Sequence, residues 1–168
     1  MGKIHNAVHN MFTNKMVIND FEGKRALKFR MGNARGNDIV GAHVEVVALM
    51  RQENSISSNL TRLVDIKLIR NNSPLFKLTW TVIHTIDDES PLRDFLLNGD
   101  DSIVGFVVTL TGYDGTYSKN TYARKTYNLE DIKIDYRMSD VTSYMGDGRI
   151  LINYNKFQRI EKIVEPES

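Results

Sequence analysis

The chain has 168 residues, 41% of them hydrophobic and 26% charged, which is the composition of a folded globular domain rather than a disordered segment. Its formal net charge is +1, with acidic and basic residues interleaved, so no basic patch marks it as a nucleic-acid binder. The absence of cysteine excludes disulfide frameworks, thiolate zinc sites and cysteine nucleophiles.

Strand signals dominate the sequence from residue 15 onward. Residues 64–70 alternate between apolar and polar side chains, which is typical of a strand with one buried face and one wet face. The continuous apolar run at 103–110 favours a strand in the centre of a sandwich, and it is far shorter than the ~20 residues of a membrane span. In chain order, the predicted strands are residues 15–18, 26–31, 44–50, 63–70, 75–86, 103–110, 131–136 and 150–157.

Helical signals are few and short. Ser90 and Pro91 are typical of the N-cap and first position of a helix, and they predict one over residues 90–97. Residues 3–11 are the second candidate for a short helix. No long amphipathic helix lies between strands, which disfavours a parallel sheet. Seven or more short strands at close spacing therefore predict an all-β, antiparallel sandwich.

The histidines give little support to an enzyme or a metal site. His5 and His9 have the spacing of two metal ligands on one helix face, but no third ligand lies nearby, which favours a solvated pair. His84 lies in an apolar run, which favours a buried or half-buried histidine with a hydrogen-bond partner over a catalytic base. Composition and spacing alone therefore indicate a β domain that acts as a binding or structural module.

Three blocks of sequence resemble a known family. Residues 29–35 read FRMGNAR, and AHV follows at 42–44. Residues 83–92 read IHTIDDESPL. The third block begins with LTG at 110–112, continues with ARKTY at 123–127 and ends with NYNKF at 153–157. In this order, over about residues 12–157, the blocks resemble the C-terminal cytoplasmic domain of prokaryotic inward-rectifier potassium channels.

The resemblance implies a fold and a setting. It implies an immunoglobulin-like β-sandwich at 12–160 with one or two short helices, a linker from a second membrane helix at 1–11, and a flexible tail at 161–168. It also implies a homotetramer that extends a K⁺ pore, joined to the inner membrane through transmembrane helices that precede this domain, with the domain itself in the cytoplasm. Neither enzymatic activity nor a cofactor, metal or nucleic-acid partner is expected.

The resemblance also implies a pore girdle, a loop around the channel axis formed by Gly112, Tyr113, Asp114 and Gly115. A plain hairpin turn fits the same residues equally well from sequence alone. The family's acidic residue just before the girdle glycine is replaced here by Thr111, and a second family acid falls near residues 57–58, which are both serine. Asp114 is a candidate substitute. We therefore expect weaker polyamine block than in strongly rectifying relatives.

Lys3, Lys15 and Arg35 are the candidates for contact with anionic lipid or with the linker. Arg35 matches the family arginine that tethers the linker region, although an exposed loop arginine is an equal alternative. Two other functions stay open at this point. One is a free-standing β-sandwich binding module that serves no channel, and the other is an enzyme or metal protein that uses His5, His9 or His84.

Overall fold

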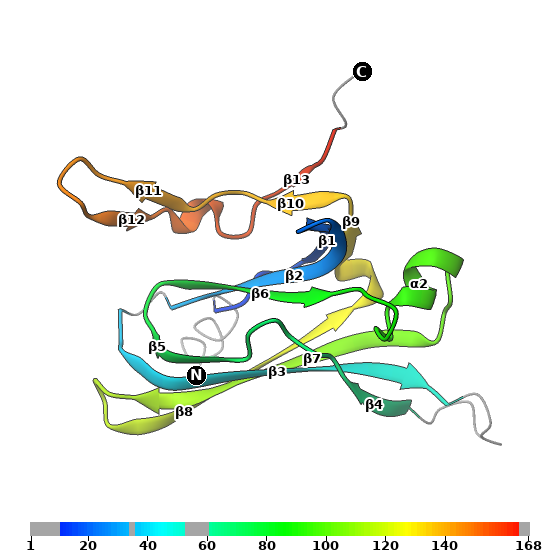
Figure 1. The fold of residues 1–168 in the computed structure, drawn as a ribbon. Helices are drawn as coiled ribbons and strands as arrows, with labels where there is room; N and C mark the ends of the chain where they lie inside the picture. The colour runs from blue at the N-terminus through cyan, green and yellow to red at the C-terminus, as the bar shows by residue number, and fades with distance from the viewer. Residues whose placement is uncertain (1–10, 34–35, 53–60, 165–168) are drawn as a thin grey trace.

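The structure, a computed structural model, describes residues 11–33, 36–52 and 61–164 (Figure 1). Short strands make up most of this part of the chain. The strands of the two main sheets are β1 (Met16–Phe21), β2 (Lys24–Gly32), β3 (Ile39–Arg51), β4 (Thr61–Asp65), β5 (Asn72–Phe76), β6 (Thr79–Thr85), β7 (Ile103–Asp114), β8 (Lys119–Asn128) and β9 (Ile132–Ile134). The remaining elements are α2 (Arg93–Asn98), η1 (Leu129–Asp131), β10 (Tyr136–Met138), β11 (Thr142–Tyr144), β12 (Ile150–Ile152), η2 (Tyr154–Lys156) and β13 (Ile160–Lys162).

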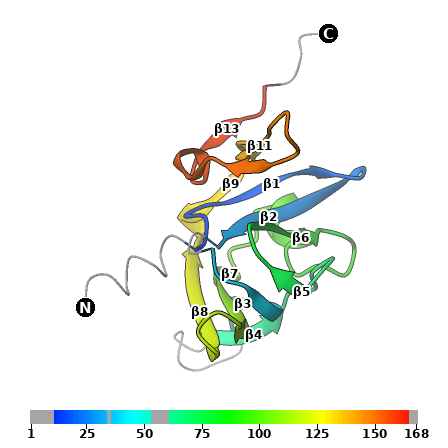
Figure 2. The same cartoon turned by 90° about the vertical axis from the view of Figure 1, so that its left-hand side faces the viewer.

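Two sheets pack face to face (Figures 1 and 2). One has four strands in the order β6-β2-β1-β9, and the other has five, with the order β4-β3-β7-β8 and β5 paired to β3. The pairs within the two sheets are antiparallel, except that β1 and β9 run parallel over three residues. This arrangement confirms the predicted all-β sandwich.

The core lies between the two sheets and takes the alternate residues that the strand pleat turns inward. Phe29 of β2 and Tyr127 of β8 meet there, with ring centroids 5.9 Å apart, and both side chains are buried. The Tyr127 hydroxyl donates to the Thr13 carbonyl oxygen at 2.6 Å, so this buried polar group is satisfied. Burial raises the pKa of Tyr127 far above its ordinary value and keeps the phenol neutral.

The strand predicted at 63–70 is only partly correct. β4 ends at Asp65, and the chain then crosses to the other sheet, where the Ile69 amide donates to the Ile83 carbonyl oxygen at 2.9 Å. Ile66 is buried and Lys67 exposed, because the crossing segment still lies with one side on the core. The contact of this segment with the core explains the alternation of apolar and polar residues from which a strand was predicted.

The single strand predicted at 75–86 is two strands. β5 pairs with β3 in the five-stranded sheet, whereas β6 pairs with β2 in the four-stranded sheet. The chain therefore changes sheets between Phe76 and Thr79. Both strands bury apolar side chains on the same core, so the hydrophobic pattern continues across the change.

The predicted helix at 90–97 begins later than expected. The structure has α2 from Arg93, and its N-cap residue, Leu92, makes no capping bond through its side chain. The Ser90 hydroxyl oxygen instead accepts from the Leu92 amide at 3.1 Å in the preceding turn. The helix predicted at 3–11 falls almost wholly outside the described residues. No helix in the described part of the chain has the length and apolar character needed to cross a bilayer.

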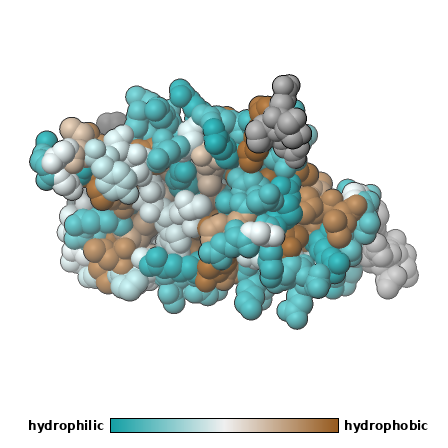
Figure 3. All heavy atoms as spheres, turned by 45° about the horizontal axis from the view of Figure 1, so that its top comes forward, coloured by the Kyte–Doolittle hydropathy of each residue, from teal (hydrophilic) through white to brown (hydrophobic). Residues whose placement is uncertain are grey.

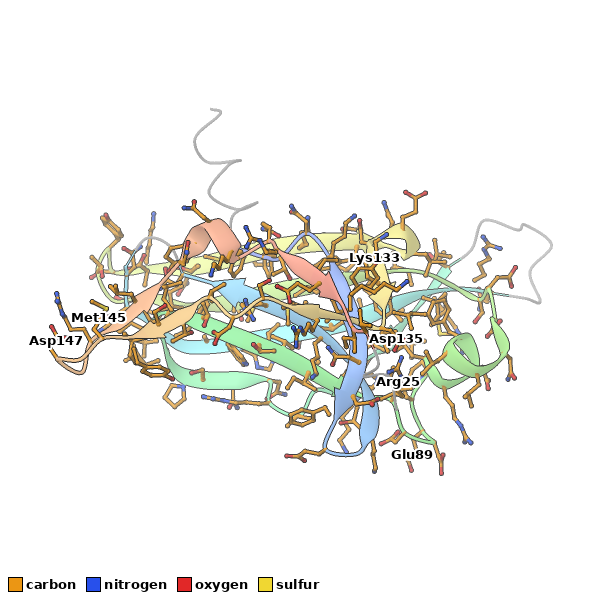
Figure 4. All side chains as sticks on the ribbon, turned by 90° about the horizontal axis from the view of Figure 1, so that it is seen from above. Arg25, Glu89, Lys133, Asp135, Met145 and Asp147 are labelled. Carbon is orange, nitrogen blue, oxygen red and sulfur yellow. The ribbon has the colours of Figure 1, made fainter. Side chains whose placement is uncertain are left out.

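A third layer of small strands lies on the outside of the four-stranded sheet (Figures 1 and 2). The chain enters it at Asp135, where φ is +62° and the carboxylate accepts from Arg25 at 2.7 Å (Figure 4). β10 then pairs with β13, and β11 pairs with β12 in a hairpin whose end carries Met145 and Asp147. A flexible tail was expected from residue 161, but in the structure residues 161–162 belong to strand β13.

Candidate functional site

The hairpin between β7 and β8 contains the residues predicted to form a pore girdle. Gly112, Tyr113 and Asp114 lie in β7, paired in register with β8, and only Gly115 lies in the four-residue turn at 115–118. We call residues 115–118 the β7–β8 turn. The strands therefore extend further toward the end of the hairpin than the sequence indicated, because cross-strand pairing continues through Asp114 and Lys119.

Asp114 is buried, with 3% of its surface exposed, and its carboxylate holds the β7–β8 turn in place. One carboxylate oxygen, Oδ1, accepts from the amides of Thr116 at 2.9 Å and Tyr117 at 3.1 Å. The other, Oδ2, accepts from the Asn37 side-chain amide at 3.0 Å. A carboxylate engaged in this way is not presented to solvent. The expectation that Asp114 replaces an exposed wall carboxylate is therefore wrong for this arrangement.

The described residues between β2 and β3, Asn33 and residues 36–38, adjoin the β7–β8 turn, and we call them the β2–β3 loop. Its Asn33 side chain donates to the carbonyl oxygens of Asn37 at 2.6 Å and Phe76 at 3.2 Å. The Asp38 carbonyl oxygen accepts from the Gly115 amide at 2.9 Å. Buried amide side chains of this kind fix a loop, because an unmade bond would leave a desolvated polar group. The β2–β3 loop and the β7–β8 turn are thus parts of one hydrogen-bonded unit.

Next to this unit, exposed apolar side chains form a row across three strands. Val40 of β3 is paired with Leu75 of β5 on one side and with Tyr113 of β7 on the other. Their exposed fractions are 45%, 48% and 44%. On the face shown in Figure 3, hydrophilic residues dominate and hydrophobic ones form separate patches.

The outer face of the five-stranded sheet also carries charge beside this row. His43 of β3 lies opposite Thr111 of β7, and Glu45 lies two residues further along β3, opposite Thr109. The His43 ring nitrogen Nε2 is 3.4 Å from the Glu45 carboxylate oxygen, and 70% of the Glu45 side chain is exposed. Sequence reasoning missed Glu45, although its polar position within the apolar strand at 44–50 was visible.

Lys15, a predicted lipid or linker contact, forms an ion pair within the domain. Its ammonium lies 2.9 Å from the Asp131 carboxylate, and the two side chains are 37% and 24% exposed. Burial alone would raise the pKa of Asp131, but the Asn128 amide and the Lys15 ammonium outweigh it, so the pKa of Asp131 is lowered. The positive charge of Lys15 is therefore partly neutralised by the neighbouring Asp131 carboxylate.

Other predicted positions lie outside the described residues. These are Lys3, His5, His9, Arg35 and the serines at 57–58.

His84 is the buried, hydrogen-bonded histidine that the sequence predicted. Its Nδ1 lies 2.5 Å from the Lys67 carbonyl oxygen and its Nε2 lies 2.6 Å from the Ser90 hydroxyl. A carbonyl can only accept, so Nδ1 carries the proton and the neutral ring accepts from Ser90. Burial lowers the pKa of His84, against the opposing effects of the Lys67 carbonyl and Asp87. With both nitrogens engaged, the ring has a structural role in the turn before α2.

Comparison with known proteins identifies the fold's relatives. Residues 10–168 match the family described as inward rectifier potassium channel C-terminal domain. The chain is 35% identical over 153 residues to the inward rectifier potassium channel Kirbac3.1 of Paramagnetospirillum magnetotacticum. The aligned region covers 89% of this chain and 51% of that protein. It is 24% identical over 160 residues to the human ATP-sensitive inward rectifier potassium channel 10, covering 92% of this chain and 42% of that protein.

A third relative, the G protein-activated inward rectifier potassium channel 1 of Bos taurus, is 27% identical over 161 residues, covering 93% of this chain and 32% of that protein. This chain thus spans about half, or less, of the length of the curated relatives it matches. The family match covers both sheets and the third layer of strands. It confirms the resemblance found in the three sequence blocks, and the chain belongs to the inward rectifier potassium channel C-terminal domain family.

Proposed function

We propose that this chain is the cytoplasmic part of an inward-rectifier-type potassium channel subunit. In this proposal four copies form a ring that extends the ion pore into the cytoplasm, below membrane helices carried by the longer protein. The observation that supports it most strongly is the family match over residues 10–168, which includes the entire sandwich. Movement of the rigid domain would pass signals to the membrane gate.

Within this ring, the β7–β8 hairpin end would encircle the axis. The supporting features are the exposed side chain of Tyr113 and the fixed position of the turn. The turn is held by two of its amides, which donate hydrogen bonds to the Asp114 carboxylate. A narrow opening in a pore needs a rigid rim, because a rim that changes conformation freely cannot hold one diameter. The hydrogen bonds that the Asp114 carboxylate accepts from the turn amides and from Asn37 provide that rigidity.

The proposal extends to how strongly cations block the pore. Rings of carboxylates on a pore wall concentrate cations, because a narrow low-dielectric tube focuses the electrostatic potential. Position 111 carries a threonine here, and the carboxylate of Asp114 is buried within the subunit. We therefore expect the channel to show weaker polyamine block than relatives with an acid at the position of Thr111.

Contact with anionic lipid belongs to the same proposal. Lys3 and Arg35 would supply most of the attraction, at roughly 1 kcal/mol for each basic residue near an anionic surface. Lys15 would add less than an unpaired lysine, because its ammonium is paired with Asp131. A phosphoinositide headgroup or another anionic lipid would satisfy the same chemistry.

The oligomeric state of the 19.3 kDa chain tests the proposal. Light scattering after size exclusion, over a series of concentrations, should give a mass near four times that of the chain. Assembly depends on concentration by mass action, so the series must reach high concentration. A strict monomer at the highest concentration would contradict assembly through this domain and would favour the free-standing binding module. In that case the sequence encoded upstream distinguishes a channel subunit from a free-standing module, since only a channel subunit requires membrane helices.

A further inference from the structure

The part of the chain around η2 binds the residues through which the chain enters the sandwich. We call residues 153–158 the η2 segment. Its last residue, Gln158, binds the backbone at 12–14 through both ends of its side-chain amide. Oε1 accepts from the Asn14 amide at 2.6 Å, and Nε2 donates to the Phe12 carbonyl oxygen at 3.0 Å. A neighbouring strand would also donate to one peptide group and accept from another. The Gln158 side chain thus takes the place of such a strand.

The sandwich itself holds residues 12–14 at their middle. The Thr13 amide donates to the Arg30 carbonyl oxygen at 2.9 Å, and the Tyr127 hydroxyl donates to the Thr13 carbonyl oxygen at 2.6 Å. Thr13 and Tyr127 are buried, whereas Gln158 is exposed. Hydrogen bonds of an exposed side chain can be exchanged for bonds to water at a small net cost. The two bonds of Gln158 can therefore open while Thr13 stays anchored in the folded domain.

The η2 segment also contacts the end of β2 and the β2–β3 loop. The Phe157 ring lies so close to Gly32 that a methyl group on the glycine would be 2.9 Å from the ring carbon Cε2. The Tyr154 hydroxyl donates to the Asn33 carbonyl oxygen at 3.2 Å. Asn33 belongs to the β2–β3 loop, which is hydrogen-bonded to the β7–β8 hairpin. One short segment thus binds both the entry of the chain and the loop that supports the β7–β8 turn.

Hydrogen bonds within the η2 segment keep it in one shape. The Lys156 amide donates to the Asn153 carbonyl oxygen at 3.1 Å, and the Phe157 amide donates to the Tyr154 carbonyl oxygen at 3.2 Å. The Asn153 side chain accepts from the Asn155 amide at 3.1 Å. The Phe157 side chain is buried against the sandwich. A turn that is bonded internally and anchored by a buried ring moves as a unit, so it can carry a displacement from one of its ends to the other.

We propose that Gln158 is a latch, closed in this structure, that couples residues 12–14 to the β7–β8 turn through the η2 segment and the β2–β3 loop. When the latch opens, Tyr154 loses its fixed position, and the loop and the turn open more often. In the channel proposed above, residues 12–14 follow the linker from the membrane, so the latch would pass movement of that linker to the rim of the pore. This consequence rests on the proposed function, whereas the coupling itself does not.

Hydrogen exchange of single amides, followed by NMR on this chain, tests the coupling. Gln158→Ala removes both bonds of the latch. We expect the Asn14 amide to exchange about fivefold faster, because it loses its acceptor. The Gly115 amide, which donates to the Asp38 carbonyl oxygen in the β2–β3 loop, should exchange about threefold faster. Faster exchange at Asn14 with no change at Gly115 would show that Gln158 has only a local effect, and would overturn the inference.

Tyr154→Phe interrupts the path at a second point, since it keeps the ring and removes the hydroxyl that binds Asn33. It should speed exchange at Gly115 and leave Asn14 unchanged. When Gln158→Ala is added to this variant, only Asn14 should exchange still faster. A further acceleration at Gly115 in the double variant would show that the two residues act independently, and would overturn the path through the η2 segment.

Arg137→Gln is the matched control, because Arg137 is exposed and binds Glu161 within the third layer. It should leave exchange at Asn14 and Gly115 unchanged. Faster exchange of the core amides of β3 and β7 in Gln158→Ala would indicate a loss of global stability, and would also overturn the coupling. None of these measurements requires K⁺ conduction. A subunit that carries no K⁺ current would contradict the proposed function and leave the latch standing.

Discussion

The carboxylate of Asp114 accepts a hydrogen bond from the side-chain amide of Asn37 at 3.0 Å, and this contact joins the β2–β3 loop to the end of β7, 77 positions further along the sequence. Asn37 belongs to the β2–β3 loop, and Asp114 supports the β7–β8 turn through the amides of Thr116 and Tyr117. Both side chains are buried, so neither can exchange its partner for water without opening the structure. A displacement of one loop therefore acts on the other.

Replacing Asp114 by alanine should destabilise the domain. The substitution leaves the buried Asn37 amide and two turn amides without their acceptor, and a desolvated polar group left unsatisfied costs about 1–3 kcal/mol. We expect the free energy of unfolding to fall by about 2–3 kcal/mol. Urea titration followed by circular dichroism measures it. Asp114→Asn retains an acceptor oxygen and should cost less than the alanine variant.

Asp147 is the control for that experiment. Its carboxylate also accepts hydrogen bonds, from the backbone amide and the guanidinium group of Arg149. This pair, however, is exposed at the end of the β11–β12 hairpin. Asp147→Ala should change stability by no more than about 0.5 kcal/mol, as is usual for surface positions. Equal losses for the two alanine variants would show that burial of Asp114 does not matter.

The alternation of apolar and polar residues predicted the sandwich and most of its strands, because each strand carries its own burial pattern. The same pattern could not show where the chain changes sheets. β5 and β6 bury their apolar residues on one core, so the sequence reads as one strand although Phe76 and Trp80 belong to different sheets. The division requires knowledge of which strands pair.

The candidate site was predictable in position but not in detail. Asp114 and Gly115 together have the composition of a turn, and a turn is present. The carboxylate of Asp114 accepts from Asn37, which the pairing of β3 with β7 brings beside it. The relation between Glu45 and Thr111 likewise depends on the register of that pairing. Local patterns carry no information on a partner 60 or more residues away.

A second prediction concerns Gly112, where there is no room for a side chain. A methyl group on its Cα would lie 2.6 Å from Cγ2 of Ile39, a buried residue at the start of β3. Cγ2 can move aside only by rotation about χ1, and this rotation is restricted because Ile39 is β-branched and packed in the core. Gly112→Ala should lower the free energy of unfolding by about 1–3 kcal/mol, as overpacking does.

Gly115, three residues further on, is the matched control in thermal unfolding. The nearest atom to an added methyl group there is the Asp38 carbonyl oxygen at 3.6 Å, an ordinary contact. Gly115→Ala should therefore be neutral, or stabilising by a fraction of a kcal/mol through the restricted unfolded chain. A larger loss at Gly115 than at Gly112 would contradict this account of the hairpin.

The third prediction is a loss of stability in mild acid caused by His84. Burial lowers the pKa of His84 in the folded protein below the unfolded value of 6.5. Between those two pKa values the unfolded chain binds more protons than the folded one, so protonation favours unfolding. The contribution is fully present above pH 6.5 and is lost as the pH falls from 6.5 through the folded-state pKa.

Urea titrations between pH 5 and pH 8 test the role of His84. The His84→Gln variant should be less stable than wild type at pH 8 by about 1–3 kcal/mol, because the buried hydrogen bonds to Lys67 and Ser90 are disturbed. Its stability should also depend less on pH over this range. His43→Gln is the control, since that side chain lies on the surface. An unchanged pH slope in His84→Gln would contradict the assignment.

The fourth prediction separates Lys15 from the other basic residues proposed to contact lipid. Its ammonium is paired with Asp131, so Lys15→Gln should barely change the binding of the domain to vesicles of phosphatidylcholine with phosphatidylinositol bisphosphate, measured by flotation. Asp131→Asn should strengthen binding, because it releases the lysine charge. Each variant should lose less than about 1 kcal/mol of stability, as expected for a partly exposed pair.

Lys133→Gln is the control on the neighbouring strand β9. Loss of all vesicle binding in Lys15→Gln alone would mean that the ion pair opens at the membrane and that Lys15 is the main lipid contact.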